Sequence, residues 1–184
     1  MARRLDKIVV VDVEATCWDG RPPNGQFNDI IEIGITLMDV RSLDIDKPES
    51  IIVKPTNSQI SSFCTELTTL TQQQVDQGIA FSAACKKLEK DYDTRNRVWA
   101  SWGDYDRVQF GKQCDRERIY YPFGRSHINV KNLFALKNAF RKAGSVMRAM
   151  DFLDFQFEGT LHRGVDDAWN IARILRHIFE GWEE

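Results

Sequence analysis

Two acidic residues lie two positions apart at the end of the most apolar run near the start of the chain. Asp12 and Glu14 follow the run Ile8–Val11. In an extended strand, residues two apart share one face, so the two carboxylates are expected to lie close together. Like charges repel, and burying either one without a partner is unfavourable. Either this strand end is solvated, or a cation such as Mg²⁺ is bound between the oxygens.

A second acidic site is expected in the segment ASWGDYDRVQF, which contains Asp104 and Asp106. On a helix that begins here, Asp106 stands in line with Phe110 and Cys114, on the face expected to point inward. Asp104 lies where the helix starts, and aspartate is a common N-cap residue. We therefore predict that Asp104 caps the helix and that Asp106 has the functional role.

A third acidic site is expected in the segment HRGVDDAWNIARILRHI at residues 162–178. Asp167 shares a helical face with isoleucines, and Asp166 shares its face with polar residues, which predicts a buried stripe and a solvated stripe. His162 cannot face Asp167 from the same straight helix, so it is expected in the loop before it, where Gly164 lets the chain turn. A loop histidine is most often only solvated. Beside a metal-bound acid, it becomes a candidate general base.

The elements that position these acids follow from the hydrophobic pattern. Strands are predicted at residues 7–13, 30–40, 49–55, 97–103 and 127–130. Helices are predicted at residues 71–79, 81–92, 105–117, 131–143, 145–154 and 165–180. Short connections suggest an antiparallel meander of the first three strands, and helix–strand units follow it. This order predicts a mixed α/β sheet, antiparallel at one side and parallel at the other.

The composition is that of a globular protein. The chain has 184 residues, 42% of them hydrophobic and 28% charged, which suits one domain over residues 1–184. The net charge of −2 gives no overall attraction for nucleic acid, so an anionic partner needs a local site or a metal. The spacing of the four cysteines indicates neither a disulfide framework nor a metal site, and the basic start MARRLDK is neither a signal peptide nor a membrane span. A cytoplasmic location without membrane contact is expected.

Taken together, the acidic motifs resemble those of the DEDDh branch of the 3′–5′ exonucleases. Asp12-Val13-Glu14 is similar to the first motif of that family, Tyr105-Asp106 to the second, and His162 with Asp167 to the third. The resemblance spans residues 8–179. It is greatest to the subgroup of the histone-mRNA 3′-end and enhanced-RNAi exonucleases and their bacterial sporulation-inhibitor-type relatives. The matching segments are DVEATC, IIEIG, FCTELTTLTQ, WGDYD, INVK and HRGVDDAWNIARI.

The resemblance implies a ribonuclease H-like fold, with a mixed five-stranded sheet flanked by helices, and two Mg²⁺ or Mn²⁺ ions. By analogy with the family, Asp12 bridges both ions, Glu14 and Asp167 complete the first site, and Asp106 supports the second. His162 would remove a proton from the attacking water. The implied activity is metal-dependent hydrolysis at the 3′ end of RNA or single-stranded DNA, which releases nucleoside 5′-monophosphates.

The resemblance also implies residues that contact the terminal nucleotide, where an aromatic side chain would stack on the base. These candidates are Ala15, Thr16, Phe63, Leu67, Thr68 and Tyr105. Each of them could instead pack in the core or cap a helix. The chain ends soon after the third motif, so the extra nucleic-acid-binding domain of some eukaryotic members is not expected, and their preference for structured RNAs is not carried over.

Several alternatives stay open. A basic patch could grip nucleic acid, or these residues could form a solvated helix face: Lys131, Lys137, Arg141, Lys142 and Arg148. The chain could be an inactive RNA- or protein-binding module, although all five expected catalytic side chains are present. It could be a ribonuclease H-type endonuclease, which the pairing of His162 with Asp167 disfavours. It could also act only on very short oligonucleotides or on a nucleotide-linked small molecule, since the charge is modest.

Overall fold

The computed structural model describes residues 2–180, which form a mixed sheet with helices on both faces. The strands pair in the order β4-β3-β2-β1-β5-β6. β1, β2 and β3 form an antiparallel meander, and the pairs β1–β5, β5–β6 and β3–β4 are parallel. The predicted α/β fold is therefore confirmed. The strands are β1 (Arg4–Ala15), β2 (Ile30–Asp39), β3 (Glu49–Lys54), β4 (Ile79–Ala80), β5 (Arg97–Ser101) and β6 (His127–Asn129).

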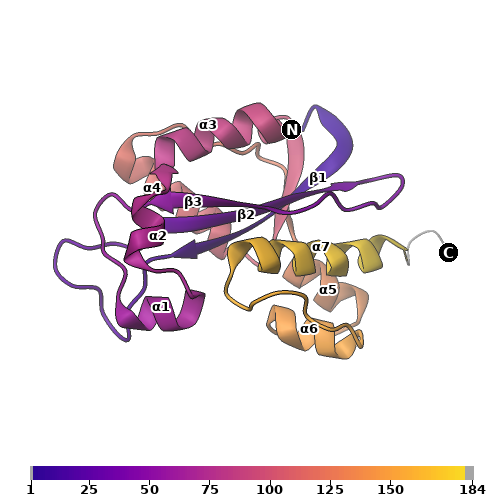
Figure 1. Ribbon diagram of the computed structural model, residues 1–184. Coiled ribbons are helices and arrows are strands. Elements are labelled where there is room, and N and C mark those ends of the chain that lie inside the picture. The colour runs from indigo at the N-terminus through magenta and orange to yellow at the C-terminus, as the bar shows by residue number, and fades with distance from the viewer. Residues whose placement is uncertain (1, 181–184) are drawn as a thin grey trace.

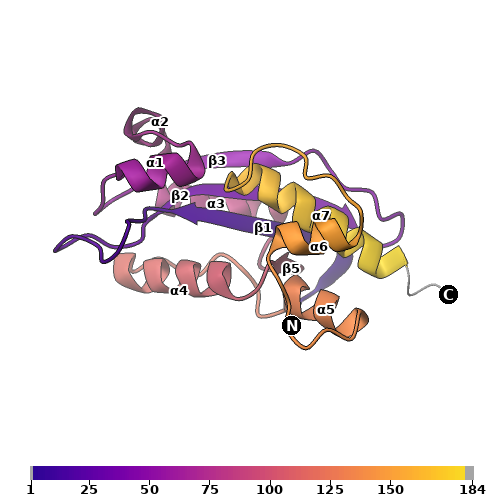
Figure 2. The same ribbon diagram turned by 90° about the horizontal axis from the view of Figure 1, so that it is seen from below.

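Helices α3 and α4 cover one face of the sheet, and helices α5, α6 and α7 cover the other (Figures 1 and 2). β1 supplies both cores, because its side chains alternate: Val9 and Val11 pack toward α3 and α4, and Ile8 and Val10 pack toward α7. The helices are α1 (Ser62–Thr68), α2 (Gln72–Asp76), α3 (Phe81–Tyr92), α4 (Tyr105–Glu117), α5 (Val130–Lys137), α6 (Val146–Phe152) and α7 (Gly164–Glu180).

The start of α7 is in direct backbone contact with β2. A Cβ atom built on Gly34 of β2 would lie 1.8 Å from the carbonyl oxygen of Gly164, the first residue of α7. A Cβ atom on Gly164 would in turn lie 3.1 Å from the carbonyl oxygen of Asp12. Only glycines allow this approach, which places the first turn of α7 against the end of β1.

Gly34→Ala is expected to lower the free energy of unfolding by about 3 kcal/mol, because neither backbone can move without disturbing the sheet. Thermal or urea unfolding measures this loss. Gly111→Ala is the matched control, because Gly111 lies within α4 and a Cβ atom there would have no neighbour within 4 Å. It should be neutral or stabilising by up to about 1 kcal/mol. Equal stability of the two variants would contradict the close contact.

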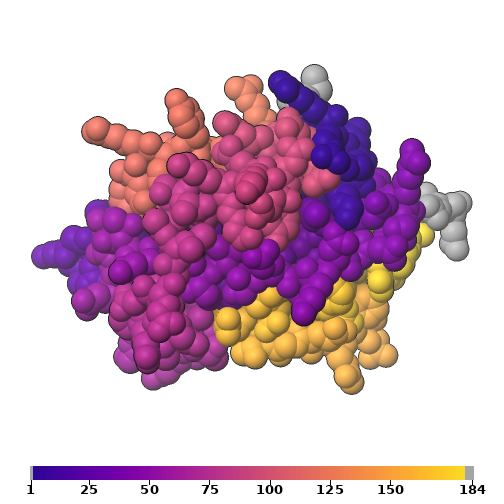
Figure 3. Space-filling model, turned by 45° about the horizontal axis from the view of Figure 1, so that its top comes forward, coloured from indigo at the N-terminus to yellow at the C-terminus, as the bar shows by residue number. Residues whose placement is uncertain are grey.

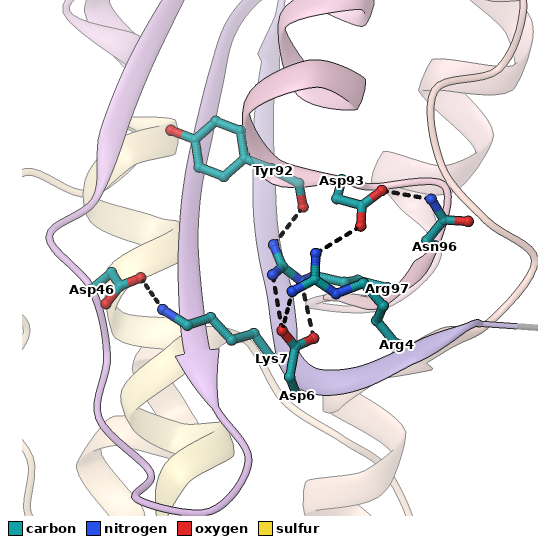
Figure 4. Close-up of polar contacts among 8 residues, drawn as sticks. All are labelled: Arg4, Asp6, Lys7, Asp46, Tyr92, Asp93, Asn96 and Arg97. Atoms are coloured by element: carbon teal, nitrogen blue, oxygen red, sulfur yellow. Dashed lines mark hydrogen bonds and ion pairs between the residues drawn. The ribbon is translucent and has the colours of Figure 1, made fainter.

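At the opposite end of β1, charged residues tie the sheet to the segment before β5 (Figure 4). Asp6 accepts hydrogen bonds from Arg97 at 3.0 Å and from Arg4 at 2.6 Å, and Arg4 also pairs with Asp93 at 3.1 Å. The hydrogen bond from Arg97 is the main cause that holds the pKa of Asp6 below its usual range. This network fixes the parallel register of β1 and β5 at the end of the sheet away from the predicted acidic site.

Three elements differ from the predicted ones. The predicted helix at 71–79 ends after Asp76, because Gly78 brings the chain within backbone contact of β3 and Ile79 starts β4, which makes a sixth strand. The predicted helix at 131–143 ends at Lys137, because Ala139 has a φ of 54° and Phe140 turns back to pack on Phe134. Helix α1 was not predicted.

Within residues 2–180, no helix is long and apolar enough to cross a membrane.

Candidate active site

The three acidic motifs meet at one end of β1. Carboxylate oxygens of Asp12, Glu14 and Asp167 lie within 4.8 Å of one another. Asp12 and Glu14 point from β1 to the α7 face of the sheet, as the alternation predicted, and Asp167 faces them from the first turn of α7. The contact of Gly34 with Gly164 sets this spacing. The structure therefore brings together side chains that are about 150 positions apart in the sequence.

Asp106 approaches the same end of β1 from α4. It is 3% exposed, and its Oδ1 accepts a hydrogen bond of 2.9 Å from the backbone N–H of Val13, between the two acids of β1. Asp104 precedes the helix, as predicted, but its side chain makes no capping bond and pairs instead with Arg107 at 3.0 Å. The buried position of Asp106 and the N-cap position of Asp104 are both confirmed, although the side chain of Asp104 adds no capping hydrogen bond.

Burial raises the pKa values of the four acids, and neighbouring carboxylates raise those of Asp12, Glu14 and Asp167 further. Burial, and then the charges of Asp106 and Asp167, raise the pKa of Asp12 well above its usual range. Burial is also the main cause that raises the pKa of Glu14 to about 9, of Asp167 to about 7 and of Asp106 to about 6. Four acids thus face one another where their charged forms are disfavoured, and a cation would relieve the repulsion.

Without metal, the protein is expected to lose stability as the pH rises. Asp167 keeps its proton up to about pH 7 in the folded state but only to about pH 4 in the unfolded state. The unfolding free energy therefore falls as the pH rises through this window, by roughly 4 kcal/mol for Asp167 alone. Glu14 extends the decline toward pH 9. Thermal unfolding in EDTA between pH 5 and 9 measures this dependence.

Added Mg²⁺ or Mn²⁺ should raise the unfolding temperature more at pH 8 than at pH 5, because protons compete with the ion for the carboxylates. The same titration on Asp12→Asn is the control, and its pH dependence should be flatter in EDTA. A wild-type unfolding temperature that is independent of pH in EDTA, or insensitive to divalent ions at pH 8, would contradict the electrostatic account of the cluster.

His162 lies in the loop before α7, as predicted, and lines the same cleft as the acids. Its backbone is left-handed, with a φ of 61°. The loop is held by Asp166, whose Oδ2 accepts a hydrogen bond of 2.8 Å from the backbone N–H of Thr160. Burial lowers the pKa of His162, which favours the neutral imidazole that a general base requires. Asp166 therefore positions the histidine loop.

The face of α7 that contains Asp166 is not the solvated stripe that was predicted. Asn170 is fully buried, and its Nδ2 donates to the carbonyl oxygens of Asp166 and Glu158 at 2.8 Å each. The prediction was wrong because an asparagine can be buried when its amide is satisfied by backbone groups. The opposite assignment, a buried stripe headed by Asp167, is confirmed by its isoleucines, which are all 0% exposed.

Glu32 of β2 is a positioning residue that the sequence analysis missed. It is fully buried and accepts hydrogen bonds from Arg163 Nε and from the backbone N–H of Gly164, both at 3.0 Å. Ser50 Oγ donates to its other oxygen. These bonds fix the residues between His162 and α7. The sequence feature that could have revealed Glu32 is its position in the apolar run IIEIG, because a buried acid needs a hydrogen-bond or charge partner.

A cleft of about 580 Å³ is lined by all five residues predicted to be catalytic, namely Asp12, Glu14, Asp106, His162 and Asp167. Of the predicted nucleotide contacts, Tyr105 also lines it, with an exposed fraction of 55%. The other walls are residues to which no catalytic role was assigned. They are Val13, Trp102, Lys131, Ser145, Val146, Met147 and Leu161.

The remaining predicted nucleotide contacts do not line this cleft. Thr16 is buried and its Oγ1 donates to the carbonyl oxygen of Phe27, and Thr68 is buried and donates to that of Cys64. Both hydroxyls are thus bonded within the fold, and contact of these two residues with a nucleotide stays a prediction. Ala15 is buried at the end of β1. For Phe63, which is 37% exposed on α1, and for Leu67, contact with a nucleotide stays a prediction.

The acidic cluster has the features of a divalent-cation site. Its ligand atoms are carboxylate oxygens, the donors that Mg²⁺ and Mn²⁺ prefer. Asp167 Oδ2 is buried and has no hydrogen-bond partner within the described residues, so one oxygen remains free to coordinate an ion. A mixed sheet with carboxylates from β1, α4 and α7 around one cleft defines a nuclease of the ribonuclease H-like class.

The chain belongs to the exonuclease family, because the family model (RNase_T, Exonuclease) matches residues 9–175. The family depends on divalent metal ions. Among curated relatives, the 3′-5′ exoribonuclease 1 of Rattus norvegicus is 33% identical over 189 residues, which cover 97% of this chain and 54% of that protein. The 3′-5′ exonuclease Snipper of Drosophila melanogaster is 27% identical, and the match covers 91% of this chain and 67% of that protein. The chain thus spans about half the length of the exoribonuclease 1 relatives.

Solved structures agree with this assignment. The nuclease domain of 3′hExo, a DEDDh family member bound to rAMP, superimposes with a TM-score of 0.88 at 29% identity, over 98% of this chain and 95% of that one. A second structure, of 3′-end specific recognition of a histone mRNA stem-loop by 3′-exonuclease, gives a TM-score of 0.86. The match covers 96% of this chain and 83% of that one. The predicted resemblance to the DEDDh branch and its ribonuclease H-like fold is confirmed.

Proposed function

We propose that this chain hydrolyses the phosphodiester bond at the 3′ end of single-stranded RNA, releases nucleoside 5′-monophosphates, and also accepts single-stranded DNA. The observation that supports this most is the convergence of Asp12, Glu14 and Asp167 within 4.8 Å in a cleft that Asp106 and His162 also line. The names of the relatives, which are 3′-5′ exoribonucleases, point to the same reaction. Residues 1–184 would act as one catalytic domain, and a cytoplasmic location stays a prediction.

Asp12, Glu14 and Asp167 would hold a divalent ion, and Asp106 would support a second one, with Mg²⁺ or Mn²⁺ as the ions proposed. Bound there, such ions polarise the phosphate and make water a better nucleophile at neutral pH. The protein holds these carboxylates rigidly: Val13 N–H orients Asp106, and the glycine contact fixes α7. Because binding geometry is set before substrate arrives, little reorganisation is needed during the reaction.

His162 would accept the proton of the attacking water at a ring nitrogen, since its lowered pKa keeps the ring neutral near pH 7. Tyr105, at the wall of the cleft, would stack on the terminal base, and aromatic stacking contributes about 1–3 kcal/mol per base. Lys131, which also lines the cleft, would attract the phosphate. Each role uses a side chain that the fold places in the cleft.

A single-stranded RNA labelled at its 5′ end tests the proposal, with Mg²⁺, with Mn²⁺ and with EDTA. The expected result is a ladder that shortens from the 3′ end, nucleoside 5′-monophosphates as product, and no reaction in EDTA. A DNA strand of the same sequence tests the broader substrate range. A circular RNA is the control and should resist. Equal cleavage of the circle would indicate an endonuclease, and absence of any cleavage would support a binding module.

A further inference from the structure

Two adjoining cavities outside the catalytic cleft are rich in arginine. The first, of about 480 Å³, is lined by Arg3, Arg95 and Arg125, and the second, of about 360 Å³, by Arg107 and Arg125. They share the segment 123–125. We call these four arginines and the cavities between them the arginine groove. Figure 3 shows the N-terminal residues, in indigo, beside the pink and salmon segments along the upper edge of the molecule.

Two of the four arginines in the arginine groove have no ion-pair partner among the described residues, whereas Arg107 is paired with Asp104 at 3.0 Å. No carboxylate among the described residues lines either cavity. Within residues 2–180, Arg3 and Arg125 form no ion pair. Arg95 is paired only with Glu89, at a distance of 3.6 Å. Several cations that share a hollow without counter-charges attract an anion with several charges.

Two arginines near the groove in sequence, unlike Arg3, have their charge neutralised by carboxylates. Arg4 and Arg97 lie close to the groove in the chain, and both are held by carboxylates: Asp6 contacts both of them and Asp93 contacts Arg4 (Figure 4). Those two arginines stabilise the fold. Arg3, one residue before Arg4, has no such partner within the described part of the chain, so its charge is available to a ligand.

The floor of the second cavity is made of packed aromatic side chains, of which Trp99 and Phe123 are themselves almost fully buried. The rings of Trp99 and Phe123 stack with their centroids 4.3 Å apart. The ring centroid of His127 lies 4.1 Å from that of Trp99. The hydroxyl of Tyr121, in the same wall, is buried without a hydrogen-bond partner among the described residues. Arginines with exposed side chains around such a floor bind phosphates by paired N–H donors.

The arginine groove and the catalytic cleft both meet the first turn of α4. Arg107, in the wall of the groove, follows directly after Tyr105 and Asp106, which line the cleft. The first turn of α4 therefore separates the two sites. Asp104, at this rim, is neutralised by Arg107 at 3.0 Å and accepts a hydrogen bond from Asn129, so it does not repel a passing phosphate strongly. A strand that leaves the cleft over this turn reaches the groove.

The basic patch predicted from the sequence is a weaker candidate for this role. Lys137 Nζ donates to the carbonyl oxygens of His177 and Ile178, at 3.3 and 2.8 Å, and so caps α7. Lys131 belongs to the cleft itself. Because the whole chain has a net charge of −2, its grip on a long polyanion must come from a local concentration of cations, and the arginine groove provides one.

We propose that the arginine groove binds backbone phosphates of the same nucleic acid strand whose 3′ end lies in the catalytic cleft. This inference rests on the proposed function, and it adds a second contact region that only strands longer than a few nucleotides reach. The contacts go to phosphates, so they confer affinity and length dependence without sequence preference. An acidic protein segment is the competing occupant, and the experiment distinguishes it.

The test compares wild type, Arg3→Ala/Arg125→Ala and, as a matched control, Arg176→Ala, which removes an exposed arginine of α7 on the other side of the sheet. Fluorescence anisotropy measures the binding of a single-stranded dodecanucleotide RNA in EDTA, as a function of salt. The double variant should bind about tenfold more weakly, and the slope of log K against log salt should fall by about 1.4, because each lost phosphate contact contributes about 0.7. The control should bind as wild type does.

Hydrolysis of a dinucleotide, which is too short to reach the groove, keeps the two proposals separate. The double variant should cut it at the wild-type rate, and its unfolding temperature should be unchanged. Unchanged dodecanucleotide binding, or an equal loss for the dinucleotide and the dodecanucleotide, would overturn the inference. So would a loss of poly-glutamate binding with RNA binding intact, which would indicate an acidic protein partner. If the wild-type protein cuts no substrate, the proposed function fails. The anisotropy measurement of RNA binding still tests the arginine groove in that case.

Discussion

Asp12→Asn is expected to lower the rate of 3′-end hydrolysis by at least about a thousandfold. Asp12 is the acid on which the others converge: the charges of Asp106, Asp167 and Glu14 all raise its pKa, after burial. An amide at this position keeps the shape of the side chain but removes the negative charge that a divalent ion needs. Single-turnover hydrolysis of a labelled RNA with saturating Mg²⁺ or Mn²⁺ measures the effect.

The same variant should fold at least as well as wild type. In the absence of metal, the substitution removes one charge from a cluster of mutually repelling carboxylates, so the unfolding temperature in EDTA at pH 8 should rise. Asp115→Asn is the control, since Asp115 is an exposed acid of α4. It should change neither activity nor stability. Activity of Asp12→Asn within tenfold of wild type would remove Asp12 from the catalytic machinery.

The second large effect is expected where two adjacent aspartates have different roles. Asp167→Asn should lower the rate at least about a hundredfold, because Asp167 is 6% exposed and directs its carboxylate into the cluster. Asp166→Asn should lower the rate only a few-fold. Its Oδ2 accepts a hydrogen bond from the backbone of Thr160, and the amide oxygen of an asparagine can accept the same bond.

Comparison of kcat and KM for the two variants on one RNA substrate separates these roles. Asp167→Asn should reduce kcat, and metal titration should require higher concentrations of Mn²⁺. Asp166→Asn should keep the metal dependence of wild type. If Asp166→Asn were the more damaging of the two, the assignment of faces on α7 would be wrong.

The faces on which the candidate acids lie could be predicted from the spacing of residues along each element. Alternation along β1 placed Asp12 and Glu14 on one face, and the isoleucines of α7 placed Asp167 on the buried stripe. These patterns reflect the burial of apolar side chains, which decides both the element and its orientation. The order of strands and helices then indicated the mixed sheet, which the structure confirms.

The parts that were not predicted depend on contacts between distant residues. Gly34 has no side chain to signal its contact with Gly164, and only the packed structure shows it. Glu32 is an acid in an apolar run, and its partner Arg163 is 131 residues away. The early end of α5 follows from the packing of Phe140 against Phe134. Tertiary contacts of this kind override local preference, and a single sequence does not reveal them.

The arginine groove escaped the sequence analysis for the same reason. Its members come from the N-terminus, the segment before β5, α4 and the segment before β6, and no two of them are close in the sequence. By contrast, the predicted basic patch was a cluster in sequence, and one of its members, Lys137, proved to cap a helix. Charge that is contiguous in the chain is therefore a poor guide to charge that is contiguous on the surface.

The most direct test of the account is the location of manganese in crystals of the protein soaked with Mn²⁺, by anomalous diffraction. Anomalous density is expected between the carboxylates of Asp12, Glu14 and Asp167, with Asp106 beside it, and this density should be lost in Asp12→Asn. A crystal saturated with Mn²⁺ that shows no density at this cluster, or shows it only elsewhere, would contradict the claim that these acids form a metal centre.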